Sequence, residues 1–401
     1  MANLPLRRSI LQAGLGTLLL PLHGMAADKA APEKPAKANP NPKADPKAQA
    51  PAQPSWPAWE TFRTQFMNEG GRILSGTEGS GQTYSEAQSY GLFFALVAND
   101  RAAFDKILAW TENNLCGGDM TAQLPAWLWG KRGDGTWGVI DSNPASDSDL
   151  WIAYALGEAG RLWNDRRYRA LSGLLAARIL REETADLPGL GRTLLPAPKG
   201  FTQGDKRWRL NPSYMPLQLM EWFAQTQPQP QWRALVNSSR DIIIGSSPKG
   251  FTPDWTLYDA DKGFLPDTEG AEKGQGAYNA IRVYLWAGML HTNAPDRQRV
   301  LDALAPMARF ISQQGYPPEH IDILSGQSSG AAASGFSAAV LPFLKAHKDS
   351  AALQEQRLRM DARPIRANAY YEQALGLFGV GWDEGVYQFT ATGQLQVRWQ
   401  R

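Results

Sequence analysis

The chain has 401 residues, of which 43% are hydrophobic and 20% are charged, as in an ordinary soluble protein of one or two domains. Residues 1–55 hold seven Lys or Arg and three Asp or Glu, so the rest of the chain carries a net charge of −2. That balance excludes the overall positive charge by which proteins bind nucleic acids, and it favours a neutral polymer as the partner.

The first 55 residues are predicted to be an export signal followed by a tether. Two arginines precede an apolar run over 10–22, and small residues suited to a cleavage site follow at 24–26. This is the order of a removable signal peptide over 1–26. The run is shorter than the ~20 residues of a membrane-spanning helix. Residues 27–55 are mostly Ala, Pro and Lys, which predicts a disordered linker. We therefore expect a periplasmic or secreted protein, exported by the Sec or the twin-arginine route, with no membrane span after processing.

Residues 56–401 are predicted to form one all-α domain with a few short strands in its loops. Apolar side chains recur at helical spacing, as at Trp59, Phe62 and Phe66. We expect helices over 59–66, 86–97, 104–115, 147–163, 166–181, 212–225, 230–244, 277–290, 297–314, 332–346 and 367–378. Only 192–195 and a hairpin of 386–389 with 395–397 are typical of strands. No sequence repeat is visible, and the pattern leaves open whether helix pairs close into a toroid.

Cysteine and histidine are too scarce for metal or thiol chemistry. Cys116 is the only cysteine, so no intramolecular disulfide forms. The chain has four histidines, one of them in the predicted signal, and none lies in a recognisable motif. No metal and no cofactor is expected.

Aromatic residues are more numerous than the core of such a domain needs. Fifteen Trp and twelve Tyr are present, and surplus aromatic rings are typical platforms for sugar rings, whose C–H faces stack on indole. Trp127, Trp129, Trp208, Trp255 and Tyr258 lie in polar or loop-like stretches and are candidates. For any one of them, packing in the core is an equally good interpretation.

The first of three notable loop-to-helix junctions covers residues 84–91. It places Glu86 at the start of a helix, beside Tyr84 and Tyr90. A carboxyl group partly enclosed by aromatic rings has a raised pKa, which suits a general acid. The alternative is a first-turn glutamate that merely complements the helix dipole.

The second junction covers residues 141–151 and carries Asp147 and Asp149 at a helix start. We expect Ser146 or Asp147 to cap that helix. Two acids two residues apart cannot both be caps, so one is expected to face a cleft while the other anchors the turn. Acid-rich capping alone explains part of this pattern.

The third junction, residues 274–282, has a glycine-rich backbone that opens a helix carrying Tyr278, Asn279 and Arg282. Tyr278 and Arg282 are four residues apart and therefore share one helix face. We expect both to line one site.

Taken together, these motifs resemble glycoside hydrolase family 8, and in particular its branch of periplasmic endo-β-1,4-glucanases encoded with bacterial cellulose synthase. The resemblance covers essentially all of 56–401. Besides the three junctions, it rests on the segments 56–59, 98–105, 124–130, 158–163, 188–191, 211–214, 315–319 and 335–339.

The resemblance implies an (α/α)6 barrel that hydrolyses β-1,4-glucan with inversion at the anomeric carbon. The family's proton donor falls on Glu86, and the acid of its Ala-Ser-Asp-x-Asp motif falls on Asp147. Since water is the nucleophile of an inverting enzyme, Asp147 is expected to bind and distort the sugar. A long groove is expected to hold the glucan, and its binding residues would be Tyr90, Trp127, Trp129, Trp208, Tyr214, Trp255, Tyr278 and Arg282.

Asn279 departs from the family pattern. The catalytic base of the family is the Asp of a Tyr-Asp-Ala-x-Arg motif, and an asparagine can position water but cannot take its proton. The loss of a base typically costs ~10²–10⁴ in rate. Three explanations remain open: Asn279 is a natural loss of the catalytic base, it is an introduced substitution, or another acid serves as the base. The acids considered for that role are Asp147, Asp254, Asp259, Asp267, Glu269 and Glu272. Ala87 and Ser148 also replace glycines usual in the family.

Three functions remain open from the sequence. The first is a monomeric endo-β-1,4-glucanase associated with cellulose biosynthesis, with the cellulose synthase complex as a partner and with its activity impaired by Asn279. The second is a catalytically silent glucan-binding module that assists cellulose secretion. The third, less favoured, is a helical toroid that acts on a uronic-acid polymer or chitosan.

Overall fold

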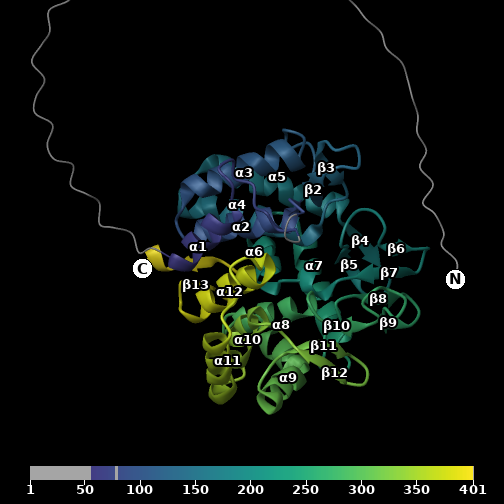
Figure 1. The fold of residues 1–401 in the computed structure, drawn as a ribbon. Coiled ribbons are helices and arrows are strands. Elements are labelled where there is room, and N and C mark those ends of the chain that lie inside the picture. The colour runs from purple at the N-terminus through teal and green to yellow at the C-terminus, as the bar shows by residue number, and fades with distance from the viewer. Residues whose placement is uncertain (1–55, 77–79, 401) are drawn as a thin grey trace, which may run out of the picture. The chain divides into compact units, whose positions relative to one another are not determined.

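The structure is a computed structural model that describes residues 56–76 and 80–400. The predicted signal peptide over 1–26 and linker over 27–55 lie outside the described residues. Helices dominate the described part of the chain, which confirms the expected helical class (Figure 1). The α-helices are α1 Pro57–Phe66, α2 Ser85–Val97, α3 Arg101–Leu115, α4 Ser146–Leu162, α5 Arg166–Glu182, α6 Leu217–Thr226, α7 Gln231–Gly245, α8 Ala280–Met289, α9 Arg297–Gln314, α10 Ser334–Ala346, α11 Ser350–Ala362 and α12 Tyr370–Asp383.

Short antiparallel strands fill the loops between the helices. Their bounds are β1 Thr83–Tyr84, β2 Leu128–Lys131, β3 Trp137–Asp141, β4 Thr184–Leu187, β5 Gly191–Leu194, β6 Thr202–Gln203, β7 Arg207–Leu210, β8 Thr256–Asp259, β9 Gly263–Pro266, β10 Gln275–Gly276, β11 Pro318–Asp322, β12 Ser328–Ala331, β13 Tyr387–Phe389 and β14 Leu395–Val397. They pair as β1-β2-β3, β4-β5, β6-β7-β8-β9, β10-β11-β12 and β13-β14. Pro212–Tyr214 and Arg398–Gln400 form 3₁₀ turns.

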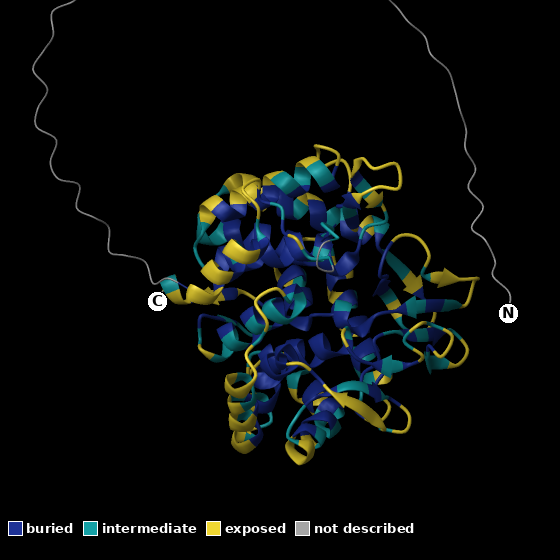
Figure 2. Cartoon of the chain, in the orientation of Figure 1, coloured by how far each residue is buried: buried dark blue, intermediate teal, exposed yellow. Residues whose placement is uncertain are grey.

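Buried and half-buried helices alternate along the chain. Helices α2, α4, α6, α8 and α10 are buried over most of their length and α12 over half of it, whereas α3, α5, α7 and α9 bury only one stripe each. A helix that is apolar all round must be covered on every side, while one with a single apolar stripe covers others. The even-numbered helices therefore lie inside and the odd-numbered ones outside, and Figure 2 shows the same contrast.

The inner helices pack side by side in chain order. Contacts join α2 to α4, α4 to α6, α6 to α8, α8 to α10 and α10 to α12. Aromatic contacts then bring α12 back to α2, because the ring of Phe378 lies 4.9 Å from that of Tyr90 and 4.6 Å from that of Phe94. Gly379 lies so close to Ala338 that a Cβ there would stand 1.9 Å from its carbonyl oxygen, so only glycine allows this approach of α12 to α10.

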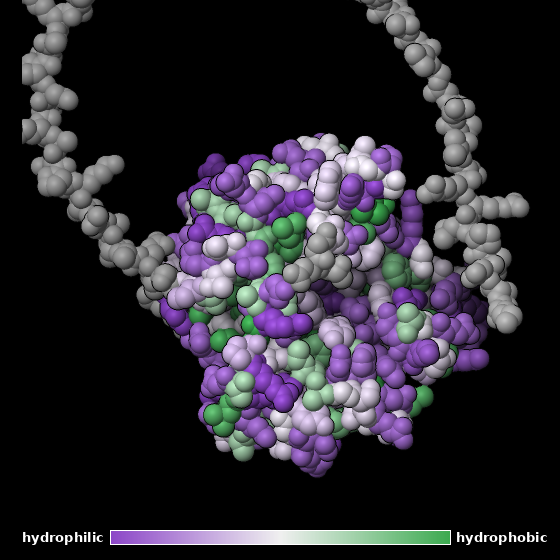
Figure 3. Space-filling model, viewed as in Figure 1, coloured by the Kyte–Doolittle hydropathy of each residue, from purple (hydrophilic) through white to green (hydrophobic). Residues whose placement is uncertain are grey.

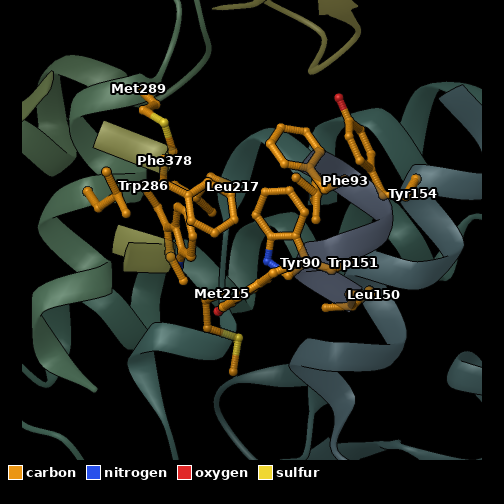
Figure 4. Close-up of a cluster of buried hydrophobic side chains, with 14 of the residues drawn as sticks. Tyr90, Phe93, Leu150, Trp151, Tyr154, Met215, Leu217, Trp286, Met289 and Phe378 are labelled. Carbon is orange, nitrogen blue, oxygen red and sulfur yellow. The ribbon is translucent and has the colours of Figure 1, made fainter. Parts of the chain in front are cut away.

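The centre of the core is aromatic. Trp151 lies between the rings of Phe93 and Trp286, with centroid distances of 4.9 and 5.3 Å. Tyr90 and Phe378 pack against the same cluster (Figure 4). Because these residues come from α2, α4, α8 and α12, their packing fixes those helices relative to one another.

Several predicted elements differ from the structure. The helix predicted over 212–225 is wrong at its start, where a 3₁₀ turn is followed by Pro216, and α6 begins only at Leu217. The helix predicted over 277–290 begins at Ala280. Helix α11 was not predicted, because it buries only Ala352 and Gln356 and so lacks an apolar stripe. Most strands were also missed, since runs of two to five residues show little alternation.

Among the described residues, no helix is long and apolar enough to cross a lipid bilayer. Cys116 is buried at the end of α3, and burial raises the pKa of its thiol.

Candidate active site

A cavity of about 800 Å³ opens where the first turns of α2, α8, α10 and α12 meet. Glu86, Tyr278, Asn279, Arg282 and Tyr371 line it. Figure 3 shows this face of the molecule hollowed near its centre, with both hydrophilic and hydrophobic residues around the hollow. The first and third junctions therefore contribute to one site.

Arg282 is the centre of the polar network in this cavity. It lies on α8 and is 3% exposed. Its Nη1 donates to Glu86 Oε2 and, over 3.2 Å, to Asp147 Oδ2. Nη1 also donates to the Tyr90 hydroxyl over 3.0 Å. One buried guanidinium thus joins two carboxyl groups, from α2 and α4.

Glu86 remains in contact with the cavity although its surroundings are largely buried. Its side chain is 23% exposed. Burial raises the pKa of Glu86, and the nearby Asp147 raises it further, while the Arg282 charge and hydrogen bond oppose this shift. The net direction is upward, so Glu86 stays protonated to a higher pH than an ordinary glutamate.

Asp147 lies deeper than Glu86. The predicted cap at Ser146 or Asp147 is wrong, because Ala145 is the N-cap of α4 and no side chain caps it. Asp147 Oδ1 instead accepts from the backbone nitrogen of Ser148 over 2.8 Å, and its Oδ2 faces Arg282. Burial raises the pKa of Asp147, and Arg282 again opposes that shift.

Asp149 points away from Arg282 and lies against Glu183, the residue that ends α5. Both side chains are completely buried, and none of their four carboxyl oxygens has a hydrogen-bond donor among the described protein groups. Burial raises the pKa of each carboxyl well above its ordinary value. Two such groups in contact satisfy each other only by sharing a proton, which ties the start of α4 to the end of α5.

Asn279 is held by hydrogen bonds at the start of α8. Its Oδ1 accepts from Arg282 Nη2 over 2.7 Å and from Asn211 Nδ2 over 3.3 Å. Asn211 is itself fixed as the cap of the 3₁₀ turn, where its Oδ1 accepts from the Ser213 backbone. The Ser213 hydroxyl accepts from Arg282 Nη2 over 3.0 Å, which closes the network.

Asp254 has a structural task. Its Oδ1 accepts from the backbone nitrogens of Ala277, Asn279 and Ala280 over 2.7 to 3.0 Å. These are the free N–H groups at the start of α8, so Asp254 caps that helix from a neighbouring loop. The candidate base Asp254 is thus occupied and does not line the cavity.

The other acids considered as bases also lie apart from Glu86. Asp259 pairs with Arg207 over 3.1 Å, and Asp267 and Glu272 pair with Arg209. Glu269 is exposed. None of these four lines the cavity that holds Glu86.

Five aromatic residues were expected to line the groove beside the two at the junctions: Trp127, Trp129, Trp208, Tyr214 and Trp255. Two of them, Trp127 and Tyr214, keep exposed or partly exposed rings near the site. The carbonyl of Trp127 accepts from the Ser85 backbone over 2.9 Å, so this residue lies directly beside the start of α2. Its side chain is 38% exposed, and Tyr84 lies 5.2 Å from its ring. Tyr214 is partly buried, 5.8 Å from the Arg282 guanidinium.

The other three pack against neighbours. Trp208 is 7% exposed in β7 and belongs to the hydrophobic core, so its prediction as a sugar platform is wrong. Trp129 contacts the rings of Trp110 and Trp137 and the Arg72 guanidinium. Trp255 is stacked on Phe201 and lies 4.0 Å from the Arg209 guanidinium.

Tyr90 and Tyr278 differ in their access to the cavity. Tyr90 is 2% exposed, so its hydroxyl orients Arg282 and its ring packs in the core. Tyr278 is 47% exposed and donates to Glu319 Oε1 over 2.9 Å. The hydroxyl of Tyr371 donates to the carbonyl of Tyr278 and fixes this segment.

Sequence reasoning missed Asn211, Ser213, Glu319 and Tyr371 as site residues. Asn211, Ser213 and Glu319 lie in segments shared with the family, whereas Tyr371 lies in none of them. Nothing in the local pattern of these four residues points to a cavity formed with residues distant in sequence. Within the described residues, no group of three or more His, Cys, Asp or Glu side chains could hold a metal ion.

Comparison with known proteins gives consistent matches over most of the chain. The family model described as Glycosyl hydrolases family 8 matches residues 47–385. An endoglucanase of Escherichia coli O157:H7 is 46% identical over 345 residues, which are 86% of this chain and 92% of that protein. An endoglucanase of Xanthomonas axonopodis pv. citri (strain 306) is 45% identical over 348 residues, which are 86% of this chain and 90% of that protein.

A solved structure matches as well. The crystal structure of an endo-1,4-D-glucanase from Vibrio fischeri ES114 superimposes with a TM-score of 0.83 at 44% identity. The match covers 86% of this chain and 100% of that one.

Proposed function

The chain belongs to glycosyl hydrolases family 8, and from this premise we propose that it is an endo-β-1,4-glucanase that cleaves cellulose-type glucan with inversion. The observation that carries the proposal is the single buried Arg282, which lines the open cavity together with Glu86 and joins that carboxyl to the buried Asp147. The names of the similar proteins, endoglucanase and endo-1,4-D-glucanase, support the same reaction. The alternation of inner and outer helices supports the family's (α/α)6 barrel.

Glu86 is the proton donor in this proposal. Its raised pKa keeps the carboxyl protonated to a higher pH than that of an ordinary glutamate, and its partial exposure lets it reach a glycosidic oxygen in the cavity. Asp147 and Arg282 bind the hydroxyls of the sugar at the cleavage point, where hydrogen bonds that shorten in the transition state lower the barrier.

Asp147 is badly placed to replace the missing base. Its Oδ2 and the Oε2 of Glu86 bond to the same nitrogen of Arg282, so these oxygens lie at most two hydrogen-bond lengths, ~6 Å, apart. The acid and base of an inverting enzyme stand ~6.5–9.5 Å apart, with room for water between them. Asn279 therefore orients the water without deprotonating it, and the enzyme turns over slowly.

The glucan groove passes Trp127 and Tyr214, whose rings are accessible near Glu86 and Arg282. Trp129 and Trp255 lie at the border of the groove, where other aromatic rings pack against them. Trp208 is buried and takes no part in binding the glucan. Tyr278 stands at the cavity wall, where its exposed ring meets the chain.

The cellular role is proposed from the amino terminus and the family branch. The signal predicted over 1–26 places the enzyme in the periplasm or outside the cell, and the linker over 27–55 tethers a monomeric domain of 56–401. There it acts on glucan made by a cellulose synthase complex. A glucan-binding module that assists secretion is the second candidate function, and Asn279 is the observation that favours it.

Hydrolysis of carboxymethylcellulose tests the proposed activity. We expect the protein to lower the viscosity of the polymer early, while few reducing ends have formed, because an open cavity admits chains in their middle. A parallel rise of reducing ends and viscosity loss would indicate cleavage from chain ends. Binding of cello-oligosaccharides without any new reducing ends would favour the binding module.

A further inference from the structure

Three arginines line the part of the cavity built by α10, α11 and α12. Arg359 lies on α11, Arg363 ends that helix, and Arg366 follows in the loop to α12. None of them contacts Glu86 or Asp147, and the proposed reaction makes no use of them. We call these three residues the arginine rim.

The charges of the arginine rim are only partly compensated. Arg366 pairs with Glu372 over 3.0 Å. Among the described residues, Arg359 and Arg363 have no carboxylate within 4 Å. Burial lowers the pKa of Arg359, and the nearby charge of Arg363 lowers it further.

Arg359 is held in place without a negative partner. Its guanidinium donates to the Ser337 hydroxyl over 2.7 Å and to the carbonyl of Ala332. The hydroxyl of Ser334 donates to the carbonyl of Arg363, which fixes the end of α11 against the start of α10. The guanidinium of Arg359 is therefore set before any ligand arrives, so little entropy is lost at this residue when an anion binds, whereas only the backbone of Arg363 is fixed.

The neighbouring backbone adds to the positive potential. The N-cap residues of α10 and α12, Ala333 and Ala369, both line this part of the cavity and neither supplies a side-chain cap. The helix dipoles there favour a negative charge, and the carboxylate of Glu372 already accepts from the Gly335 backbone at the start of α10 over 3.4 Å. A neutral glucan needs hydroxyl partners but no cation, whereas an arginine fork matches a carboxylate or phosphate.

We propose that the arginine rim binds an anionic substituent, a carboxylate or a phosphate ester, carried by the β-glucan chain in the cavity. This inference rests on the proposed function, because it deepens the substrate class of the same site. It makes the protein prefer anionic over neutral β-1,4-glucan of equal length. Glu319 also lines the cavity, and among the described residues it has no cation within 4 Å. Its carboxylate accepts from the Tyr278 hydroxyl, so it does not pair with the arginine rim, which remains available to an anionic ligand.

The test compares three soluble polymers with the same backbone: carboxymethylcellulose, phosphorylated cellulose and neutral hydroxyethylcellulose. We expect Arg363→Gln to lower the ratio of kcat/KM on an anionic polymer to that on the neutral one by about threefold, the size of one exposed ion pair. The preference should also shrink as salt is added. Arg166→Gln, which makes the same change at an exposed residue of α5, should leave the ratio unchanged. The polymer that responds identifies the substituent.

A binding measurement separates this inference from the proposed function. Tryptophan fluorescence titration of Glu86→Gln, with and without Arg363→Gln, gives affinities for the same polymers without turnover. A lower affinity for the anionic polymers alone supports the arginine rim even if no polymer is hydrolysed. Equal effects of Arg363→Gln on all three polymers, in rates and in affinities, would overturn the inference while leaving glucan hydrolysis intact.

Discussion

The variant Asn279→Asp should hydrolyse soluble β-1,4-glucan ~10²–10⁴ times faster than the chain with Asn279, the usual contribution of a positioned base. Aspartate has the same shape as asparagine, and Arg282 and Asn211 already hold the Oδ1 position over 2.7 and 3.3 Å. The new carboxylate therefore falls where the amide is, and can take the proton of the attacking water. Initial rates of reducing-end release measure the gain.

The same substitution should shift the pH profile. A carboxylate at position 279 shares Arg282 with Glu86 and Asp147, which weakens the opposing effect of that arginine and raises the pKa of Glu86 further. Activity should then persist to higher pH. The double variant Asn279→Asp with Glu86→Gln is the control, since a base without its acid gives no comparable gain. If Asn279→Asp alone changes nothing, another residue is the base.

Glu86→Gln should reduce glucan hydrolysis by ~10²–10⁴ while cello-oligosaccharides still bind. Glutamine keeps an oxygen for Arg282 but has no proton to give to the glycosidic oxygen. In the parent enzyme the acid is active below its pKa, so the rate should fall as the pH rises through the raised pKa of Glu86. That alkaline fall should be missing from the residual activity of the variant, because glutamine does not titrate.

Glu60→Gln is a matched control for this prediction. Glu60 lies in the first turn of α1, where it complements the helix dipole just as the alternative interpretation of Glu86 supposes. It does not line the cavity, so its substitution should leave the rate and the pH profile unchanged. Equal rates for the parent protein and Glu86→Gln, with binding retained in both, would contradict the assignment of Glu86.

Much of the fold was predictable because its helices carry strong local patterns. Helices such as Arg297–Gln314 were placed from apolar spacing alone. Helix α11 was missed because it packs on the outside with few buried residues, and the early start of the sixth predicted helix was wrong because Pro216 interrupts it. Short strands depend on partners distant in sequence, which local spacing does not reveal.

The site was predictable only in part. Glu86, Asp147 and Arg282 were singled out from their junctions, but only the packing of α2, α4 and α8 places them on one guanidinium. The resemblance supplied their roles, which residue types alone left open. Trp208 shows the limit of composition, because a tryptophan in a polar stretch can still be a core residue of a small sheet.

The anomeric configuration of the first product tests the central claim most directly. In this experiment cellopentaose is incubated with the Asn279→Asp enzyme and, in a second sample, with a higher concentration of the parent enzyme. Proton NMR then records the anomeric configuration of the new reducing end before it mutarotates. Direct attack by water on a β-1,4 bond predicts that the α-anomer forms first. Initial formation of the β-anomer would contradict an inverting reaction with Glu86 as its acid, and the absence of any product from either protein would contradict the enzyme itself.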